Sequence, residues 1–261
     1  MNYSHQLKHY IKYRIKAGNE HSMHSPFVFD LAIKVLYDKA PFYCFDNIEA
    51  LREVLLSIDN TIEVTDFGAG SAVHKSNKRK ISDIVKHSAK KEKYGQLLFK
   101  LVNYFQSKTI LELGTSVGIS TLYLASPNSK AKVITIEGCP QIAKVAQTNF
   151  DKLKIKSIDM RVGRFDDVLP SVLKEEAQLD FVFIDGHHLK QPTIKYFEMV
   201  LKNLHNNSVL VVDDIYWSEQ MTEAWEYIKQ HPSVTVTLDM FYLGIVFFRK
   251  EQVKEHFIVK Y

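Results

Sequence analysis

The sequence predicts a mixed α/β fold in which helices cover both faces of a largely parallel sheet. Two observations support this prediction. From residue 109 onward, five short apolar runs alternate with five stretches of helical spacing, and such alternation is typical of right-handed βαβ units around a parallel sheet. After the fifth unit, Phe241 and Tyr242 alone separate two further apolar runs, too short a connection for a crossover helix, so these runs predict an antiparallel hairpin.

The seven expected strands are almost continuously apolar, which is typical of strands covered on both faces. They lie at residues 109–113, 132–137, 157–163, 179–185, 208–214, 233–240 and 243–250. The helices expected between them lie at residues 118–126, 139–153, 166–176, 191–204 and 219–230.

The region before this alternation is predicted to be mainly helical. Apolar residues recur at helical spacing near the start of the chain, at Leu7, Tyr10, Ile11 and Ile15. Ser25 followed by Pro26 is a helix-start signal, because serine caps a helix and proline suits its first position. A third helix is expected with Asp46 or Asn47 as its cap, and a fourth over about residues 82–106.

Between the third and fourth of these helices, residues 61–80 lose the helical period. They contain a glycine-rich segment, 66–71, and are expected to form a hairpin or loop beside the main sheet. We therefore expect two parts: residues 1–80, a helical extension with a short β/loop segment, and residues 81–261, the main α/β domain.

The composition is that of an ordinary globular protein. Of 261 residues, 46% are hydrophobic and 25% are charged, with a formal net charge of +4. The two cysteines, Cys44 and Cys139, suit a reducing compartment. No apolar run approaches the roughly 18–20 residues of a membrane span, and the basic, amphipathic start lacks the apolar core of a signal peptide. We expect a cytoplasmic protein with no membrane partner.

Two glycine loops compete as the site for a nucleotide-like cofactor. Residues 109–121 supply a buried strand, a tight turn with Gly114 and Gly118, and then an apolar-faced helix, which is the arrangement such a site requires. Residues 61–71 supply a strand and a turn, but polar and basic residues follow them. The segment 109–121 is therefore the predicted cofactor loop.

The pattern Glu-x-Gly-x-x-x-Gly from Glu112, followed by Glu137 at the end of the second strand, resembles the first motifs of S-adenosylmethionine-dependent methyltransferases. With the strand order, residues 85–249 resemble a Rossmann-like methyltransferase, closest to the catechol and caffeoyl-coenzyme-A O-methyltransferase group. The resemblance implies a seven-stranded sheet whose last strand is antiparallel, and S-adenosylmethionine over the carboxyl ends of the strands.

The resemblance also implies a set of cofactor-binding residues in the turns after the first four strands. The backbone of the glycine loop would face the methionine moiety, Glu137 would hold the ribose, and the turn after the third strand would flank adenine. The residues so implied are Glu112, Gly114, Thr115, Ser116, Gly118, Ser120, Glu137, Gly138, Arg164, Phe165, Asp166 and Asp185. The group usually has a small residue where Arg164 stands.

In the metal-dependent members of this group, an acid ends the fourth strand and an acid–amide pair ends the fifth. The matching positions are Asp185, Asp213 and Asp214; the last is Asp in place of the usual Asn, which leaves a role for Mg²⁺ open. His188 stands where the group places its general base, usually a lysine. A histidine can take a hydroxyl proton near neutral pH. Asp185 and His188 are thus the predicted catalytic residues.

Three further features have a functional and a structural interpretation. Trp217 is expected in the core of an amphipathic helix rather than in a substrate pocket. His21 and His24 are expected to be polar residues before a helix cap rather than metal ligands. A basic run is expected to be a solvated face, although it could grip phosphates; its residues are Lys75, Lys78, Arg79, Lys80, Lys90, Lys91 and Lys93.

We expect S-adenosylmethionine-dependent methyl transfer to a small-molecule acceptor, most of all to a hydroxyl oxygen. Two alternatives stay open: a nucleic acid or protein acceptor, and a protein that binds the cofactor without turnover. A nicotinamide oxidoreductase is disfavoured by Ser116, which stands at the middle glycine of the dinucleotide fingerprint. A fold shared by many functions does not identify the acceptor.

Overall fold

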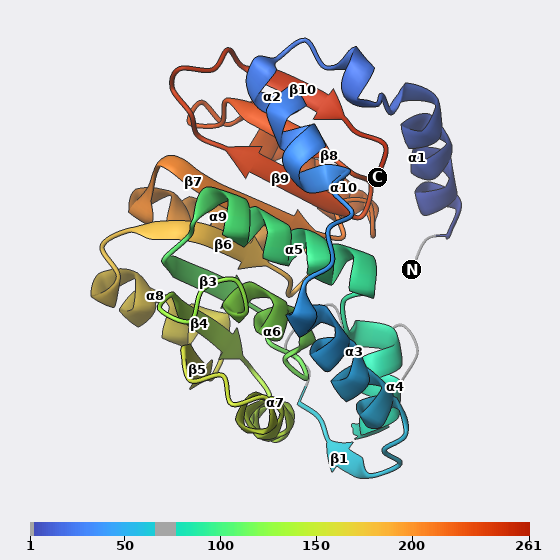
Figure 1. The fold of residues 1–261 in the computed structure, drawn as a ribbon, viewed down its shortest axis with the longest axis vertical. Helices are drawn as coiled ribbons and strands as arrows, with labels where there is room; N and C mark the ends of the chain where they lie inside the picture. The colour runs from blue at the N-terminus through green and yellow to red at the C-terminus, as the bar shows by residue number, and fades with distance from the viewer. Residues whose placement is uncertain (1–2, 66–76) are drawn as a thin grey trace. The chain divides into compact units, whose positions relative to one another are not determined.

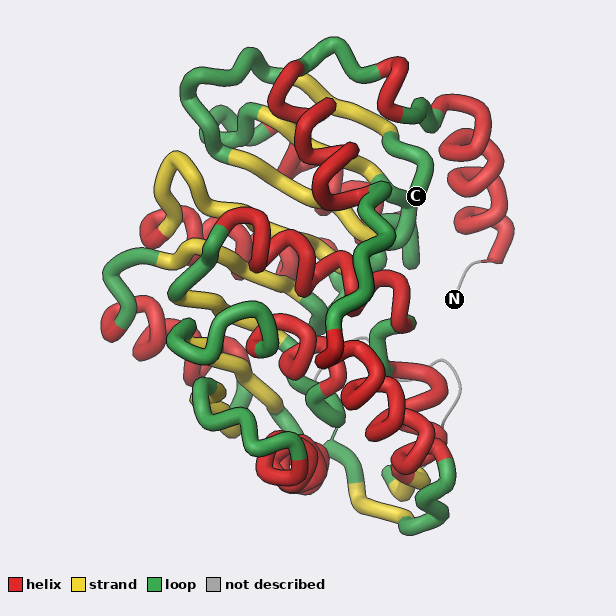
Figure 2. Tube along the Cα trace, in the orientation of Figure 1, coloured by secondary structure: helices red, strands yellow, loops and turns green. Residues whose placement is uncertain are grey.

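The computed structural model describes residues 3–65 and 77–261 (Figure 1). Contacts between residues divide the chain into two compact units, residues 39–175 and residues 1–38 with 176–261. Each unit contains its own strands and helices (Figure 2). The domain boundary predicted at residue 80 stays a prediction.

The unit of residues 39–175 is built on three parallel strands in the order β3, β4, β5. These are β3 (Thr109–Leu113), β4 (Lys132–Glu137) and β5 (Ile158–Val162). Its helices are α3 (Tyr43–Leu56), α4 (Ile81–Ser88), α5 (Glu92–Phe105), α6 (Ile119–Ala125), α7 (Pro140–Lys152) and α8 (Phe165–Glu175). Because the register pairs Leu113 with Ile136 and Glu137 with Val162, the carboxyl ends of the three strands lie side by side.

A small antiparallel pair, β1 (Thr61–Glu63) and β2 (Lys78–Lys80), belongs to the same unit. It confirms that residues 61–80 contain a hairpin-like element separate from the main strands. The glycine-rich segment 66–71 of the competing loop lies outside the described residues.

The second unit contains five strands in the order β6, β7, β9, β8, β10. They are β6 (Leu179–Ile184), β7 (Leu204–Asp213), β8 (Val236–Asp239), β9 (Leu243–Phe247) and β10 (Glu255–Ile258). Its helices are α1 (Tyr3–Lys16), α2 (Pro26–Leu31), α9 (Lys190–Val200) and α10 (Glu219–Gln230), with shorter turns η1 (Glu20–Ser22), η2 (Ala32–Leu36) and η3 (Leu201–Asn203). β6 pairs with β7 in parallel, whereas β9 is antiparallel to both β7 and β8.

The predicted α/β fold, its mostly parallel strands and its closing hairpin are confirmed. The predicted number of strands is wrong by one, because β10 adds a parallel strand to β8. Ser25 caps α2 as predicted: its side chain accepts a hydrogen bond from the backbone N–H of Val28, and Pro26 is the first helical residue.

Two helix predictions in the first unit are wrong in detail. The third helix begins at Tyr43, before Asp46 and Asn47, because Phe42 fixes its start by packing on Phe45 and on Phe99 of α5, at ring distances of 5.3 and 4.6 Å. The helix expected over residues 82–106 is two helices, α4 and α5.

The break between α4 and α5 has a physical cause in the segment Ala89–Lys91. The Arg52 side chain of α3 donates a hydrogen bond of 2.6 Å to the carbonyl oxygen of Lys90 in this segment. This hydrogen bond satisfies the Lys90 carbonyl oxygen, so that oxygen does not need a backbone N–H from a continuing helix. Glu92 then stands in the first turn of α5, where the helix dipole favours a negative charge.

Candidate active site

The predicted cofactor loop is a tight turn between β3 and α6. Three residues in it have positive φ angles: Gly114 at 107°, Ser116 at 49° and Gly118 at 86°. The Gly114 N–H donates to the carbonyl oxygen of Ile136 on β4, and the Gly118 N–H donates to that of Thr115. The turn is therefore closed on itself and fixed to the neighbouring strand.

Gly118 is the position in this loop where only glycine fits. An added Cβ would lie 2.4 Å from a ring carbon of Phe150, and the φ of 86° is unfavourable for any other residue. We expect Gly118→Ala to lower the free energy of unfolding by about 2–4 kcal/mol, measured by urea denaturation. Ser116→Gly is the matched control in the same loop. It should raise the free energy of unfolding, because glycine accepts a φ of 49° without strain. Equal stability of Gly118→Ala and the unmodified chain would contradict this prediction.

Glu112 on β3 is fully buried behind the loop. Its Oε2 atom accepts hydrogen bonds from the hydroxyl groups of Thr121 and Thr135. Its Oε1 atom is also buried, and it has no hydrogen-bond partner among the described residues. Burial raises the pKa of Glu112 to about 7, although neighbouring hydroxyl groups act in the opposite direction.

Glu137 at the end of β4 connects two turns. One carboxylate oxygen accepts from the Ser116 N–H at 2.9 Å, and the other accepts from the Cys139 N–H at 2.8 Å. The side-chain oxygen of Ser116 is buried without a hydrogen-bond partner within the described part of the chain. Gly138 lies between Glu137 and Cys139 in the turn that this second hydrogen bond closes.

The turn after β5 completes this edge of the unit. The Gly163 N–H donates to the carbonyl oxygen of Glu137, which places this turn beside the end of β4. Phe165, the first residue of α8, is buried, and the Arg164 guanidinium lies 3.7 Å from the Asp166 carboxylate. The structure thus brings the predicted residues of three turns to adjacent strand ends; Ser120, buried in the first turn of α6, lies in the same unit.

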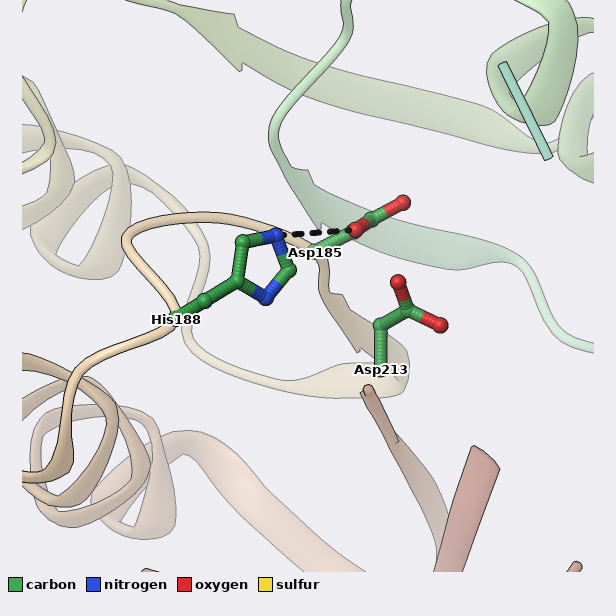
Figure 3. A group of neighbouring side chains, drawn as sticks. All are labelled: Asp185, His188 and Asp213. Atoms are coloured by element: carbon green, nitrogen blue, oxygen red, sulfur yellow. Dashed lines mark ion pairs between the residues drawn. The ribbon is translucent and has the colours of Figure 1, made fainter. Parts of the chain in front are cut away.

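A second group of predicted residues lies in the other unit, where β6 and β7 end. One ligand atom each from Asp185, His188 and Asp213 lies within 4.8 Å of the others, and Nε2 of His188 is 3.7 Å from Oδ1 of Asp185 (Figure 3). Asp213 is only 2% exposed. We call these three residues the Asp–His–Asp group.

The backbone explains how His188 reaches this group. His187 and His188 have φ angles of 65° and 43°, and the His188 N–H donates to the carbonyl oxygen of Gly186. This left-handed turn brings the imidazole back toward Asp185. Left-handed conformations are uncommon for residues other than glycine and often occur at functional sites.

The metal set predicted from the sequence was Asp185, Asp213 and Asp214, and the structure places His188 rather than Asp214 in the group. Asp214 follows directly, with a φ of 53°, and its N–H donates to the carbonyl oxygen of Tyr242 at 2.7 Å. A ligand role for Asp214 stays a prediction.

The loop after Asp214 makes contacts that the sequence did not predict. The Tyr216 hydroxyl donates to the buried carboxylate of Asp239 at 2.5 Å, and its ring lies between His9 and Phe241, at 4.8 and 5.4 Å. Asp239 ends an apolar strand, as Asp185 and Asp213 do.

Trp217 is not in a helix core, so that prediction is wrong. It lies in the loop before α10, half-buried, with its ring 6.5 Å from that of His188. The reason is that Ser218 caps α10 one residue later, accepting from the Met221 N–H. The helix therefore starts after Trp217.

The remaining candidates form no such constellation. Among the residues that the structure describes, the Asp–His–Asp group is the one set of three or more potential metal ligands, and neither His21 nor His24 belongs to it. Of the basic run, Lys80 pairs with Asp59 at 2.9 Å on the surface, and Lys75 lies outside the described residues.

Residues 111–215 match the model of a family described as a methyltransferase domain. The resemblance inferred from the sequence is thereby confirmed.

Curated relatives of this chain include proteins named as O-methyltransferases. The chain is 37% identical to a catechol O-methyltransferase of Niastella koreensis over 46% of this chain, and 28% identical to one of Mycobacterium tuberculosis over 60% of it. The matched part spans about half, 55%, of the first relative and 69% of the second.

The fold is also similar to that of solved methyltransferase structures. An O-methyltransferase from Bacillus cereus, in complex with SAH, matches 81% of this chain and 93% of its own, at 20% identity and a TM-score of 0.54. TomG from Streptomyces achromogenes, in complex with SAM, matches 85% of this chain and 95% of its own, at 20% identity and a TM-score of 0.58. No helix in the described part of the chain is long and apolar enough to cross a membrane.

Proposed function

We propose that this chain is an S-adenosylmethionine-dependent O-methyltransferase that acts on a hydroxyl group of a small molecule. The observation that carries the proposal is the Asp–His–Asp group, which lies at the carboxyl ends of two strands within a methyltransferase domain. Two carboxylates and an imidazole are suited to holding a divalent cation or to removing a proton. Both functions serve transfer to oxygen, because a hydroxyl group must lose its proton to become a good nucleophile.

The residues of the cofactor loop fit S-adenosylmethionine. This cofactor carries an ammonium group and a ribose, and it supplies a methyl group activated by a sulfonium. Glu112 offers a buried carboxylate oxygen that no described residue satisfies, which suits a cationic partner. Glu137 presents a half-buried carboxylate at the next strand end, where an acid can accept ribose hydroxyl groups.

The side chains of the Asp–His–Asp group are also suited to a ligand, in this case a divalent cation. Asp185 and Asp213 would hold the ion, with either His188 or Asp214 as a further ligand; such an ion lowers the pKa of a bound hydroxyl group. With His188 outside the ligand set, its imidazole would take the acceptor proton. The Asp185 carboxylate, 3.7 Å from Nε2, would then pair with the imidazolium that this proton transfer forms.

The acceptor class follows from the relatives and from the residues beside the group. Two bacterial relatives that the chain matches are named catechol O-methyltransferases. In this chain the Trp217 ring lies 6.5 Å from that of His188, so an aromatic side chain stands next to the proposed base. We therefore propose an aromatic hydroxyl compound as the acceptor class, with residues 81–261 as the catalytic domain and residues 1–80 as an extension that shapes the acceptor site.

Calorimetry and a transfer assay test this proposal together. We expect metal-stripped protein to bind S-adenosylmethionine, with binding weakened about 10- to 100-fold in Glu137→Ala because a charged hydrogen-bond acceptor is lost. We expect methyl transfer to catechol to require added Mg²⁺ or another divalent cation. Binding without transfer to any hydroxyl acceptor would favour a non-catalytic protein, and no binding at all would refute the methyltransferase assignment.

A further inference from the structure

Helix α1 is firmly attached along one side. His5 shares a hydrogen bond of 2.9 Å with the Thr222 hydroxyl, Gln6 donates to the carbonyl oxygen of Trp217, and His9 stacks on Tyr216. Tyr13 is 5% exposed, and its hydroxyl donates to the carbonyl oxygen of Val259. These contacts all come from one face of α1. They therefore fix which face of the helix points away from its neighbours in this unit.

The opposite face is an exposed apolar stripe. Tyr3, Leu7, Ile11 and Ile15 are 75%, 60%, 50% and 79% exposed, and they follow one another at intervals of four residues. Residues four apart lie next to each other on a helix surface, so the four side chains form one continuous row. Single exposed apolar residues are common in proteins, whereas a contiguous apolar surface indicates an interaction site. We call this row the α1 stripe.

Positive charge lies along the same helix. α1 contains Lys8, Lys12, Arg14 and Lys16, all exposed, and no acidic residue. Three of these, Lys8, Lys12 and Lys16, run parallel to the stripe at the same four-residue interval. The formal charge of α1 is therefore equal to the +4 of the whole chain, and the rest of the chain is balanced.

An apolar row beside a row of cations has a specific physical complement. Interfacial helices bury such an apolar face at the boundary between lipid headgroups and acyl chains, while lysine and arginine bind anionic headgroups. A second copy of this chain fits less well, because a two-fold contact would bring two helices of the same charge together. A nucleic acid would use the cations but would leave the apolar row exposed to water.

We propose that α1 binds the surface of a membrane that contains anionic lipids. The helix lies in the plane of the interface, with the α1 stripe inserted and Lys8, Lys12, Arg14 and Lys16 on lipid phosphates. With 14 residues it is too short to span a bilayer, which agrees with the finding that no described helix can do so. The expectation of no membrane partner rested on the lack of a spanning segment in the sequence, and binding at the membrane surface needs none.

Vesicle cosedimentation of the full chain tests the proposal. The probes are vesicles of phosphatidylcholine alone and of phosphatidylcholine with phosphatidylglycerol, each at low and at high salt. We expect binding to the anionic vesicles only, weakened by salt because exposed charges are screened. We expect the double variant Ile11→Ser with Ile15→Ser to lower the partition coefficient at least about tenfold, because two large apolar side chains no longer enter the lipid.

Matched controls separate the helix from exposed apolar surface in general. Ile33→Ser and Val253→Ser change side chains that are 46% and 84% exposed outside α1, and they should bind vesicles as the unmodified chain does. Circular dichroism should show all variants folded, since the replaced side chains are exposed. Absence of binding to anionic vesicles, or equal binding by the Ile11/Ile15 variant, would overturn the proposal. A dimer in solution that this variant dissociates would also overturn it, in favour of a second copy. None of these readouts depends on methyl transfer.

Discussion

Asp213→Asn is expected to lower kcat for methyl transfer by about 10³-fold while leaving cofactor affinity unchanged. Proton removal and metal-assisted activation of a hydroxyl group contribute effects of this size. Asp213 belongs to the Asp–His–Asp group, whereas the Glu112 and Glu137 carboxylates of the cofactor loop lie in a different compact unit. The measurement is a transfer assay at saturating S-adenosylmethionine, together with calorimetry for the cofactor and for Mg²⁺.

Stability should respond in the opposite direction to activity. In metal-free protein Asp213 is a buried carboxylate close to a second carboxylate, that of Asp185. Amide replacement removes the repulsion between the two charges, so the free energy of unfolding should stay the same or rise. An inactive variant that is at least as stable as the original chain cannot owe its inactivity to unfolding.

A matched control exists on the same strand. Asp180, near the start of β6, pairs with His205 at 2.9 Å, so it is an aspartate–histidine pair at the other end of the strand from Asp185. Asp180→Asn makes the same chemical change and should leave kcat within about twofold, because this pair is distant from the strand ends that carry the group. Equal losses in both variants, or full activity of Asp213→Asn, would contradict the proposed mechanism.

The features that the sequence predicted correctly depend on periodicity and on strand ends. Alternating apolar runs are sufficient to predict parallel βαβ units, and parallel neighbours bring their carboxyl ends together. For this reason Glu112, Gly118 and Glu137 could be grouped from the sequence alone. Asp185 and Asp213 were singled out by the resemblance to metal-dependent methyltransferases, and the structure places them near each other, after β6 and at the end of β7.

The features that were missed depend on contacts between distant segments. Tyr216 and Asp239 meet only because the loop after β7 packs on the β8–β9 turn, and no local pattern indicates such a contact. β10 is a short, half-exposed strand of four residues, too short to show a strand period in the sequence, and its pairing with β8 makes it a strand. His188 was predicted at this site as the base, but the left-handed backbone that brings it toward Asp185, at residues other than glycine, is not indicated by the sequence.

The second large effect is expected at Glu112, and it should appear as a dependence on pH. Burial raises the pKa of this carboxyl from its usual 4.5 to about 7. Between these values the folded protein holds a proton that the unfolded chain releases. This contribution to stability is therefore fully present below about pH 4.5 and is lost as the pH rises through about 7, by up to about 3 kcal/mol. Glu112→Gln should remove this dependence of stability on pH, because the amide does not titrate. The variant should therefore be more stable than the original chain at pH 8 and about equally stable at pH 5.

Cofactor binding should depend on the same proton with the opposite sign. A cationic ammonium group near Oε1 favours the ionised carboxylate, so affinity should rise as the pH increases through about 7, and binding below that pH should release a proton. Glu112→Gln should bind about 10- to 100-fold more weakly at pH 8, since a hydrogen bond to a charged group is lost, and the affinity difference should shrink at pH 6. Calorimetry at each pH, in two buffers with different ionisation enthalpies, measures both the affinity and the number of protons released. A variant that binds as tightly as the original chain at pH 8 would show that Glu112 serves the fold alone, because its stability effect would persist while its effect on binding would be absent.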